Sequence, residues 1–187
     1  MRQFFRLATI RVINRALMAM LFFTVLAGCV QSANYKNSGK PTTEHRINTD
    51  EAAETRIALG LQYLKVGEMS NAKFNLEKAL NFAPELPAVH TAFAYYYQRV
   101  DENELAEKSY LKALSYDSND ADALNNYGVF LCKVKQYTKA ENAFLKAIKV
   151  PSYLQVAQSY ENAAICALEN LKYTEAKKYF GLSLDHS

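Results

Sequence analysis

The sequence predicts an all-α protein built as a right-handed superhelical array of about four helix pairs. Three observations predict this fold. The chain has 187 residues, 50% of them hydrophobic, but only six Gly and four Pro, which disfavours both disorder and a turn-rich β-sandwich. Beyond about residue 53, apolar residues recur at helical spacing on both sides of short polar turns. This pattern returns every 34 residues, so stacked repeats are expected to provide the core.

The period is clearest at Ala72, Ala106 and Ala140, which lie 34 residues apart and are expected where two helices cross closely. The fourth copy is displaced by 36 residues, because two residues are inserted around 150–152. In its length and its small-residue positions the unit resembles the tetratricopeptide repeat, a pair of antiparallel helices. The predicted repeats span residues 53–86, 87–120, 121–156 and 157–187, within a domain covering 51–187.

The N-terminal 28 residues are typical of a secretory signal peptide. They hold four arginines and no acidic residue, and their apolar run over 16–25 is shorter than the about 20 residues that span a bilayer. Leu26-Ala27-Gly28-Cys29 resembles the lipobox of bacterial lipoproteins. That resemblance implies a lipidated Cys29 carrying acyl chains such as palmitate, and Val30 after it implies the outer membrane. The alternatives are an ordinary secreted protein and a helix anchored by its own apolar face.

Residues 29–50 are predicted to be a flexible linker, because they are polar and lack both helical and strand periodicity. Beyond the signal segment, 18 basic residues face 19 acidic ones, so a basic nucleic-acid surface is not expected. No motif predicts an enzyme, a metal site or a cofactor, since the three histidines lie far apart and no phosphate loop is present.

Cys132 and Cys166 are predicted to be packed thiols, with a disulfide as the alternative. They take the twelfth and tenth places of their repeats. Two residues on a helix correspond to about 200°, so the two side chains are expected to point to different faces.

The resemblance to tetratricopeptide arrays implies that the candidate binding surface is the concave groove formed by the first helices of the pairs. Ile57, Leu61 and Leu64 form an apolar stripe at i, i+4 and i+7 beyond the expected core. The other predicted partner-binding residues are Tyr95, Gln98, Asn125, Asn126 and Asn162. The alternative is that the stripe packs under the linker and the asparagines serve contacts between helices.

Several stretches narrow the resemblance further, among them residues 72–80, 122–132 and 147–153 behind the lipobox. Over about residues 16–187 the chain resembles the type IV pilus biogenesis/stability lipoproteins, the PilF/PilW pilotin family. The resemblance implies a non-enzymatic outer-membrane lipoprotein that binds the pilus secretin subunit and promotes its localisation and multimerisation. The chain is shorter than some relatives, which carry extra repeats. A general periplasmic scaffold for barrel assembly or peptidoglycan enzymes is the alternative function.

The last predicted helix carries Phe180, Leu182 and Leu184, and part of its outer face is expected to stay uncovered. A partner or a homodimer contact through the C-terminal repeat is therefore predicted.

Overall fold

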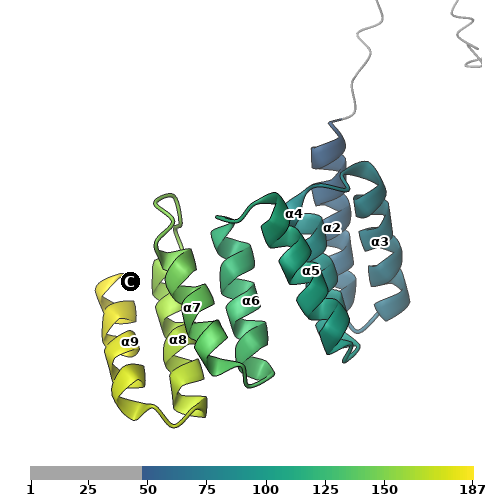
Figure 1. Ribbon diagram of the computed structural model, residues 1–187. Helices are drawn as coiled ribbons and strands as arrows, with labels where there is room; N and C mark the ends of the chain where they lie inside the picture. Colours follow the sequence, from purple (N-terminus) through teal and green to yellow (C-terminus); the bar gives the residue numbers. More distant parts are fainter. Residues whose placement is uncertain (1–47) are drawn as a thin grey trace, which may run out of the picture. The chain divides into compact units, whose positions relative to one another are not determined.

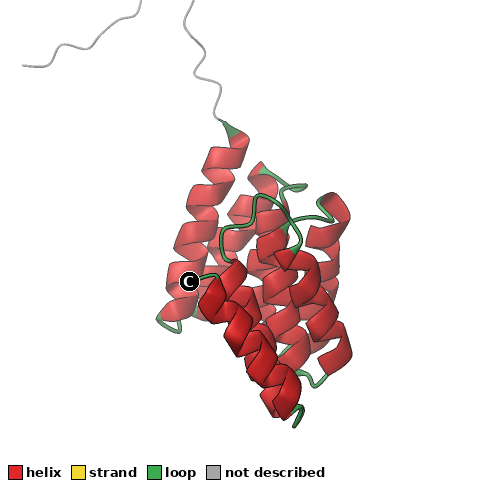
Figure 2. Cartoon of the chain, turned by 90° about the vertical axis from the view of Figure 1, so that its left-hand side faces the viewer, coloured by secondary structure: helices red, strands yellow, loops and turns green. Residues whose placement is uncertain are grey.

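The computed structural model describes residues 48–187, and every regular element in that range is an α-helix (Figures 1 and 2). The all-α prediction is confirmed. The predicted signal peptide, Cys29 and most of the predicted linker lie outside the described residues. The helices are α2 (Thr49–Lys65), α3 (Met69–Phe82), α4 (Pro87–Arg99), α5 (Asn103–Tyr116), α6 (Ala121–Lys133), α7 (Tyr137–Ile148), α8 (Val156–Glu169) and α9 (Tyr173–Asp185).

Local capping explains where several helices begin. The Asn48 side chain accepts hydrogen bonds from the backbone N–H groups of Asp50 and Glu51, so α2 begins at Thr49, slightly before the predicted start of the domain. Asp120 caps α6 by accepting from the N–H of Ala123 at 2.9 Å. Pro87 occupies the first turn of α4, where a missing N–H costs no intrahelical bond.

Each helix pair turns at a residue in the left-handed backbone region. These residues hold the same place in all four repeats, and they are Gly67 (φ 83°), Asp101 (φ 61°), Lys135 (φ 62°) and Leu171 (φ 58°). The following residue donates its N–H to a carbonyl five positions earlier, as Glu68 does to Tyr63 at 2.9 Å. The turn geometry is therefore repeated even where the residue is not glycine.

The pairs stack into a single array. The first helices of the pairs are α2, α4, α6 and α8, here called the A helices, and their partners α3, α5, α7 and α9 are the B helices. Each A helix packs on its own B helix, and each B helix packs on the next A helix. The A helices also contact one another along the array, whereas no such contact joins successive B helices among residues 48–187. The A helices therefore form the tighter, concave layer (Figure 1).

Small residues allow the two helices of each pair to approach closely. The predicted alanine column is confirmed, since Ala72, Ala106 and Ala140 are all fully buried. Gly128 on α6 is equally constrained, because a Cβ built there would lie 2.6 Å from Cε1 of Phe144 on α7. The Phe144 side chain is itself fully buried, so its ring would have to shift to admit a methyl group at Gly128.

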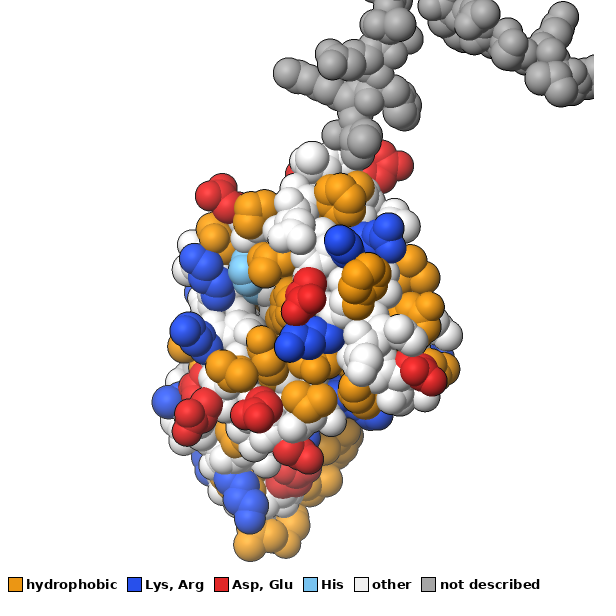
Figure 3. Space-filling view, turned by 90° about the vertical axis from the view of Figure 1, so that its right-hand side faces the viewer, with side chains coloured by type: hydrophobic (Ala, Val, Ile, Leu, Met, Phe, Trp, Pro, Cys, Tyr) orange, Lys and Arg blue, Asp and Glu red, His pale blue; other side chains and the backbone are white. Residues whose placement is uncertain are grey.

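The end of the array at α2 and α3 exposes residues that are covered elsewhere. Leu59 on α2 is 42% exposed, whereas Phe93 at the same place in the next repeat is 8% exposed. The difference arises because Phe93 packs against the preceding helix pair, and no described helix covers Leu59. Figure 3 faces this end of the array and shows hydrophobic side chains interspersed with charged ones.

The prediction that Cys132 and Cys166 are unpaired is wrong. The two residues form a disulfide between α6 and α8, with their Cα atoms 5.7 Å apart. Places ten and twelve are indeed separated by about 200° around a helix axis, but this separation brings the two cysteines together instead of keeping them apart. When two A helices lie side by side, the side of the first that contacts the second is opposite, around the helix axis, to the side of the second that contacts the first. Residues at places twelve and ten, which are about 200° apart, therefore point toward one another across the gap.

We expect Gly128→Ala to destabilise the chain by about 1–3 kcal/mol, because the new methyl group overpacks the contact with Phe144. Gly181→Ala is the matched control, since Gly181 lies within α9 and nothing surrounds its missing Cβ within 4 Å. The control is expected to leave stability unchanged or to raise it, because alanine favours helix over glycine. Denaturant unfolding followed by circular dichroism measures both, and equal midpoints for the two variants would contradict the packing argument.

Removal of the disulfide is expected to lower the free energy of unfolding by about 2–4 kcal/mol, because the bond closes a long loop in the unfolded chain. The measurement compares the wild type with Cys132→Ala/Cys166→Ala, each with and without reducing agent. Reduction should destabilise only the wild type. A peptide map of the unreduced protein that finds two free thiols would refute the bond itself.

Candidate functional site

A groove lies on the concave face of the array. Its volume is about 750 Å³, and its lining comes mainly from α2, α4 and α6. Residues from the three A helices that line it include Leu61, Tyr95, Asn126 and Val129, with Tyr110 reaching in from α5. A groove therefore lies on the face where the sequence analysis expected one, and its role in binding stays a prediction.

An apolar ridge runs across the A helices. It consists of the ninth residue of each repeat, Leu61 (36% exposed), Tyr95 (42%), Val129 (44%) and Ile165 (44%). The side chain of the ninth residue points away from both the paired B helix and the neighbouring A helices, so stacking of the pairs cannot bury it. A row of large apolar side chains that the fold leaves in water is typical of a binding surface.

The predicted stripe on α2 is only partly exposed. Leu61 lies in the groove, and Ile57 lies at its edge while packing into the core between the first two pairs. Leu64, however, is fully buried and offers no surface to a partner. It holds the twelfth place of its repeat, as Gln98 does in the second and Cys132 in the third, but of these three only Gln98 lines the groove.

The predicted asparagines separate into two groups. Asn126 is exposed and lines the groove. Asn125 is buried, and its Oδ1 accepts hydrogen bonds from Ser159 Oγ at 2.9 Å and Asn162 Nδ2 at 3.0 Å. Asn125 and Asn162 thus join α6 to α8, which is the role in helix contacts that the sequence left open as the alternative.

Polar groups lie beside the apolar ones in the groove. Gln98 Nε2 donates to the Tyr110 hydroxyl at 2.8 Å, and burial raises the pKa of that phenol well above its ordinary value. The phenol therefore stays neutral. Thr91 also lines the groove, and its buried hydroxyl oxygen has no hydrogen-bond partner among the described residues.

Charged side chains lie at opposite ends of the groove. Asp120 and Asp122 stand at the start of α6, and Lys65 stands at the end of α2. Burial is the largest cause of the raised pKa of Asp120, opposed by its hydrogen bond from Ala123. Because α2 and α6 run in the same direction, the acidic and basic ends are separated along the helix axes (Figure 1).

A second pocket extends the concave surface toward α8. Its volume is about 290 Å³, and Val129 borders both it and the main groove. Ile165, the last residue of the ridge, and both cysteines of the disulfide also line it. Val129 therefore separates the groove from this pocket on the concave surface.

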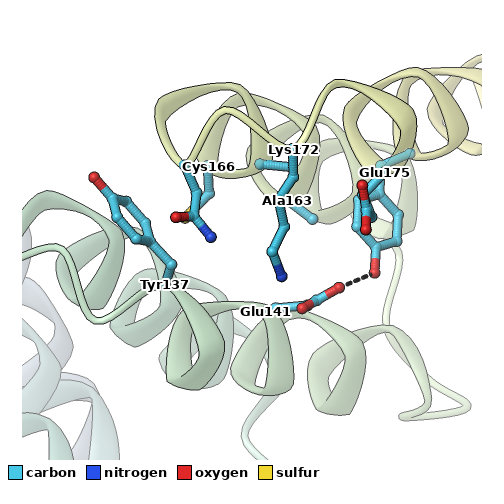
Figure 4. A pocket seen from close by; sticks show the side chains of 9 residues that line it. Tyr137, Glu141, Ala163, Cys166, Lys172 and Glu175 are labelled. Carbon is cyan, nitrogen blue, oxygen red and sulfur yellow. Dashed lines mark hydrogen bonds between the residues drawn. The ribbon is translucent and has the colours of Figure 1, made fainter.

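A third pocket lies between α7, α8 and α9 and is too small for a ligand, with room of about 10 Å³. Figure 4 shows its side chains, with the Tyr179 hydroxyl donating to the Glu141 carboxylate. Burial and this carboxylate raise the Tyr179 pKa, so the phenol remains a neutral donor. The arrangement fastens α9 to α7 and offers no reactive group.

Within residues 48–187 no cluster of His, Cys, Asp and Glu side chains is arranged to hold a metal ion. In the same range no helix combines the length and the apolar character needed to cross a membrane.

Leu61 and Tyr95 are among the predicted partner-binding residues, whereas Val129, Ile165, Thr91 and the aspartates are not. Comparison of the ninth place of all four repeats would have identified the whole ridge, since each copy carries a large apolar residue there. The Thr91 hydroxyl has no such signal, because its lack of a partner depends on tertiary packing.

Comparisons with known proteins agree with this architecture. The tetratricopeptide repeat family matches residues 53–86, 88–120 and 109–142. The type IV pilus assembly protein PilF of Pseudomonas aeruginosa is 39% identical over 170 residues, which cover 91% of this chain and 66% of PilF. An uncharacterized protein of Haemophilus influenzae is 34% identical over 158 residues, covering 84% of this chain and 82% of that protein.

Solved structures show the same relationship. The structure of P. aeruginosa PilF superposes with a TM-score of 0.69 at 39% identity, covering 74% of this chain and 63% of that one. PilW, described as a widely conserved type IV pilus biogenesis factor, gives a TM-score of 0.66 at 27% identity, covering 71% of this chain and 61% of PilW. The chain thus spans somewhat less than two thirds of the length of these pilus proteins, and it belongs to their family of type IV pilus tetratricopeptide-repeat proteins.

Proposed function

We propose that the protein acts in type IV pilus biogenesis by binding a segment of the pilus secretin subunit in its concave groove. Binding would promote localisation of the secretin to the outer membrane and its multimerisation. The observation that carries the proposal is an exposed apolar ridge, of which Leu61, Tyr95 and Val129 line a groove of about 750 Å³ and Ile165 lines the neighbouring pocket. Such a surface suits a polypeptide segment with apolar side chains.

The relatives support a role in this system. PilF is named as an assembly protein and PilW as a biogenesis factor of type IV pili. The groove in this chain offers contact surface and hydrogen-bonding groups, so we propose a binding protein rather than an enzyme. No bond is made or broken in the proposed mechanism.

We further propose that Cys29 is lipidated and anchors the chain to the periplasmic face of the outer membrane. The lipobox-like sequence at Leu26–Cys29 motivates this step. The Cys132–Cys166 disulfide supports a location outside the cytoplasm, because disulfides persist in oxidising compartments. A membrane tether raises the effective concentration of a captured secretin subunit at the membrane where it assembles.

The proposed mechanism predicts distinct effects for two substitutions. Cys29→Ala should mislocalise secretin multimers, because the tether is lost. Leu61→Asp should abolish capture of the secretin, because the carboxylate of the new aspartate would lie on the apolar ridge. The helical fold should stay intact, because Leu61 is partly exposed. Probing outer-membrane fractions for SDS-resistant secretin multimers measures both effects.

Leu111→Asp is the matched control, because Leu111 is 52% exposed on α5 and does not line the groove. Its secretin multimers should be normal. Normal multimers in both Cys29→Ala and Leu61→Asp would rule out the proposed mechanism, in which the groove captures the secretin and the lipid anchor holds it at the membrane. Intact secretin multimers in a deletion strain, with a barrel-assembly complex that co-purifies with the protein, would instead favour the general scaffold.

We also propose a homodimer contact through the C-terminal repeat. Phe180 and Leu184 on α9 are 36% and 76% exposed, whereas Phe144, the counterpart of Phe180 in the preceding repeat, is fully buried. Solution scattering over a wide concentration range should show a dimer that Leu184→Lys dissociates. A strict monomer at every concentration would remove this contact.

A further inference from the structure

The connection between α7 and α8 differs from the other two connections at the same edge of the array. At this edge the A helices begin and the B helices end, and the connections there cover residues 83–86, 117–120 and 149–155. The third has seven residues, whereas each of the other two has four. Figure 1 shows it extending beyond the ends of the two helices that it joins. We call residues 149–155 the α7–α8 loop.

Contacts with the core hold the backbone of the α7–α8 loop in place. The Tyr153 side chain is buried beside Leu124, and its hydroxyl shares a hydrogen bond of 2.9 Å with Ser159 Oγ. The N–H of Tyr153 also donates to the carbonyl of Val150 at 3.1 Å, which closes a turn. The side chains that the loop leaves outside are therefore presented by a fixed backbone.

Leu154 is the large apolar side chain that this loop leaves in water. It is 95% exposed, and Leu184, the next most exposed large apolar residue within residues 48–187, is 76% exposed. The core therefore gains almost nothing from the Leu154 side chain, whose contact with water is unfavourable. An apolar environment that covers Leu154 from outside the molecule would remove that contact.

The charges of the α7–α8 loop also distinguish it from its neighbours. Its one charged residue is Lys149, whereas Glu85 lies in the first connection at this edge, and Asp117 and Asp120 lie in the second. A leucine beside a lysine, in a loop without acids, suits the interface of a bilayer. There the apolar side chain can reach the acyl chains while the ammonium group stays among the phosphates.

The start of α2 brings this edge of the array toward the proposed lipid anchor. Eighteen residues, 30–47, separate Cys29 from Asn48, and a chain of that length spans at most about 65 Å. Asn48 caps α2 at the edge where the A helices begin, which is also the edge of the α7–α8 loop (Figure 1). Since α2 is about 25 Å long, the opposite edge lies that much farther from the point of attachment. The anchor therefore favours contact between a bilayer and the edge that carries Leu154.

We propose that the α7–α8 loop is a second membrane contact, whose partner is the interface of a phospholipid bilayer. Leu154 enters the interface and Lys149 lies among the headgroup phosphates. A weak contact suffices, because the anchor keeps the loop at a high effective concentration near the bilayer. The helices then stand on the membrane by one edge, and the concave groove faces along the membrane surface. This inference rests on the proposed function through the anchor at Cys29, and it adds the orientation of the anchored array.

Fluorescence quenching of the lipidated protein tests the contact. The vesicles contain phosphatidylethanolamine and phosphatidylglycerol, with a phospholipid that carries a spin label near its headgroup. An NBD label on Ser152→Cys, in the loop, should be strongly quenched. The same label on Ser70→Cys, exposed near the start of α3 at the opposite edge, should not be. Equal quenching at the two positions, or stronger quenching at the opposite edge, would overturn the proposal.

Leu154→Ser in the protein labelled at position 152 should weaken the quenching about fivefold, the change expected when one leucine loses partial burial. Its thermal midpoint should equal that of the wild type, because the Leu154 side chain is almost fully exposed. Leu171→Ser is the matched control, since Leu171 is 70% exposed between α8 and α9 at the opposite edge. The control should leave the quenching unchanged. Quenching that persists in Leu154→Ser would refute the role of this side chain.

A protein partner is the other occupant that the experiment detects. Iodide quenches the NBD label from the aqueous side, so a covered loop is protected from it. If the label at position 152 is not quenched by spin-labelled lipid, and is protected from iodide only when the secretin is present, the loop contacts protein. That result would overturn the membrane contact.

These outcomes are distinguishable from failure of the proposed function. If the purified protein does not float with the vesicles, the anchor fails and this inference fails with it. If the protein floats but the label in the loop is not quenched by lipid, only this inference fails. If the label is quenched while secretin multimers form normally without the protein, the orientation stands and the secretin role fails.

Discussion

The close approach of two helices at small residues is the constraint on which the rest of the structure depends. Ala72, Ala106 and Ala140 are fully buried where the helices of a pair cross, and Gly128 leaves no space against Phe144. Tight pairs present flat apolar sides that can only be buried by the next pair, so stacking follows from the same residues. Because the A helices contact one another and the B helices do not, the stack curves and a concave face results.

The stacking of the pairs decides which side chains are exposed in the groove. The ninth place of each repeat is the one that neither the paired helix nor the neighbouring pairs cover, and every repeat carries a large apolar residue there. Leaving these side chains in water costs free energy, which a bound apolar segment recovers. The polar and charged groups around the ridge add direction and selectivity, since they favour only certain orientations of a partner.

The junction between the third and fourth pairs departs from the regular period. Two inserted residues lengthen the connection before α8, and buried polar groups replace part of the apolar contact. Tyr153 from this connection hydrogen-bonds Ser159 at 2.9 Å, and Ser159 donates to Asn125. The disulfide between α6 and α8 lies in the same junction. Hydrogen bonds and a covalent bond require defined geometry. The relative position of the third and fourth helix pairs is therefore fixed more closely than that of two pairs held by apolar packing alone.

The sequence by itself determined the all-α class, the repeat length and the crossing alanines, because all three follow from a period that local residues repeat. The helix layer that forms the groove was implied by the resemblance to the tetratricopeptide repeat. Only the tertiary structure decided that Leu61 is exposed while Leu64 is buried, that Asn125 serves a contact between helices, and that Cys132 meets Cys166. Helical spacing tells which residues share a side of one helix. Which side the next helix covers, and whether two side chains face each other across the gap, depends on how neighbouring helices are placed.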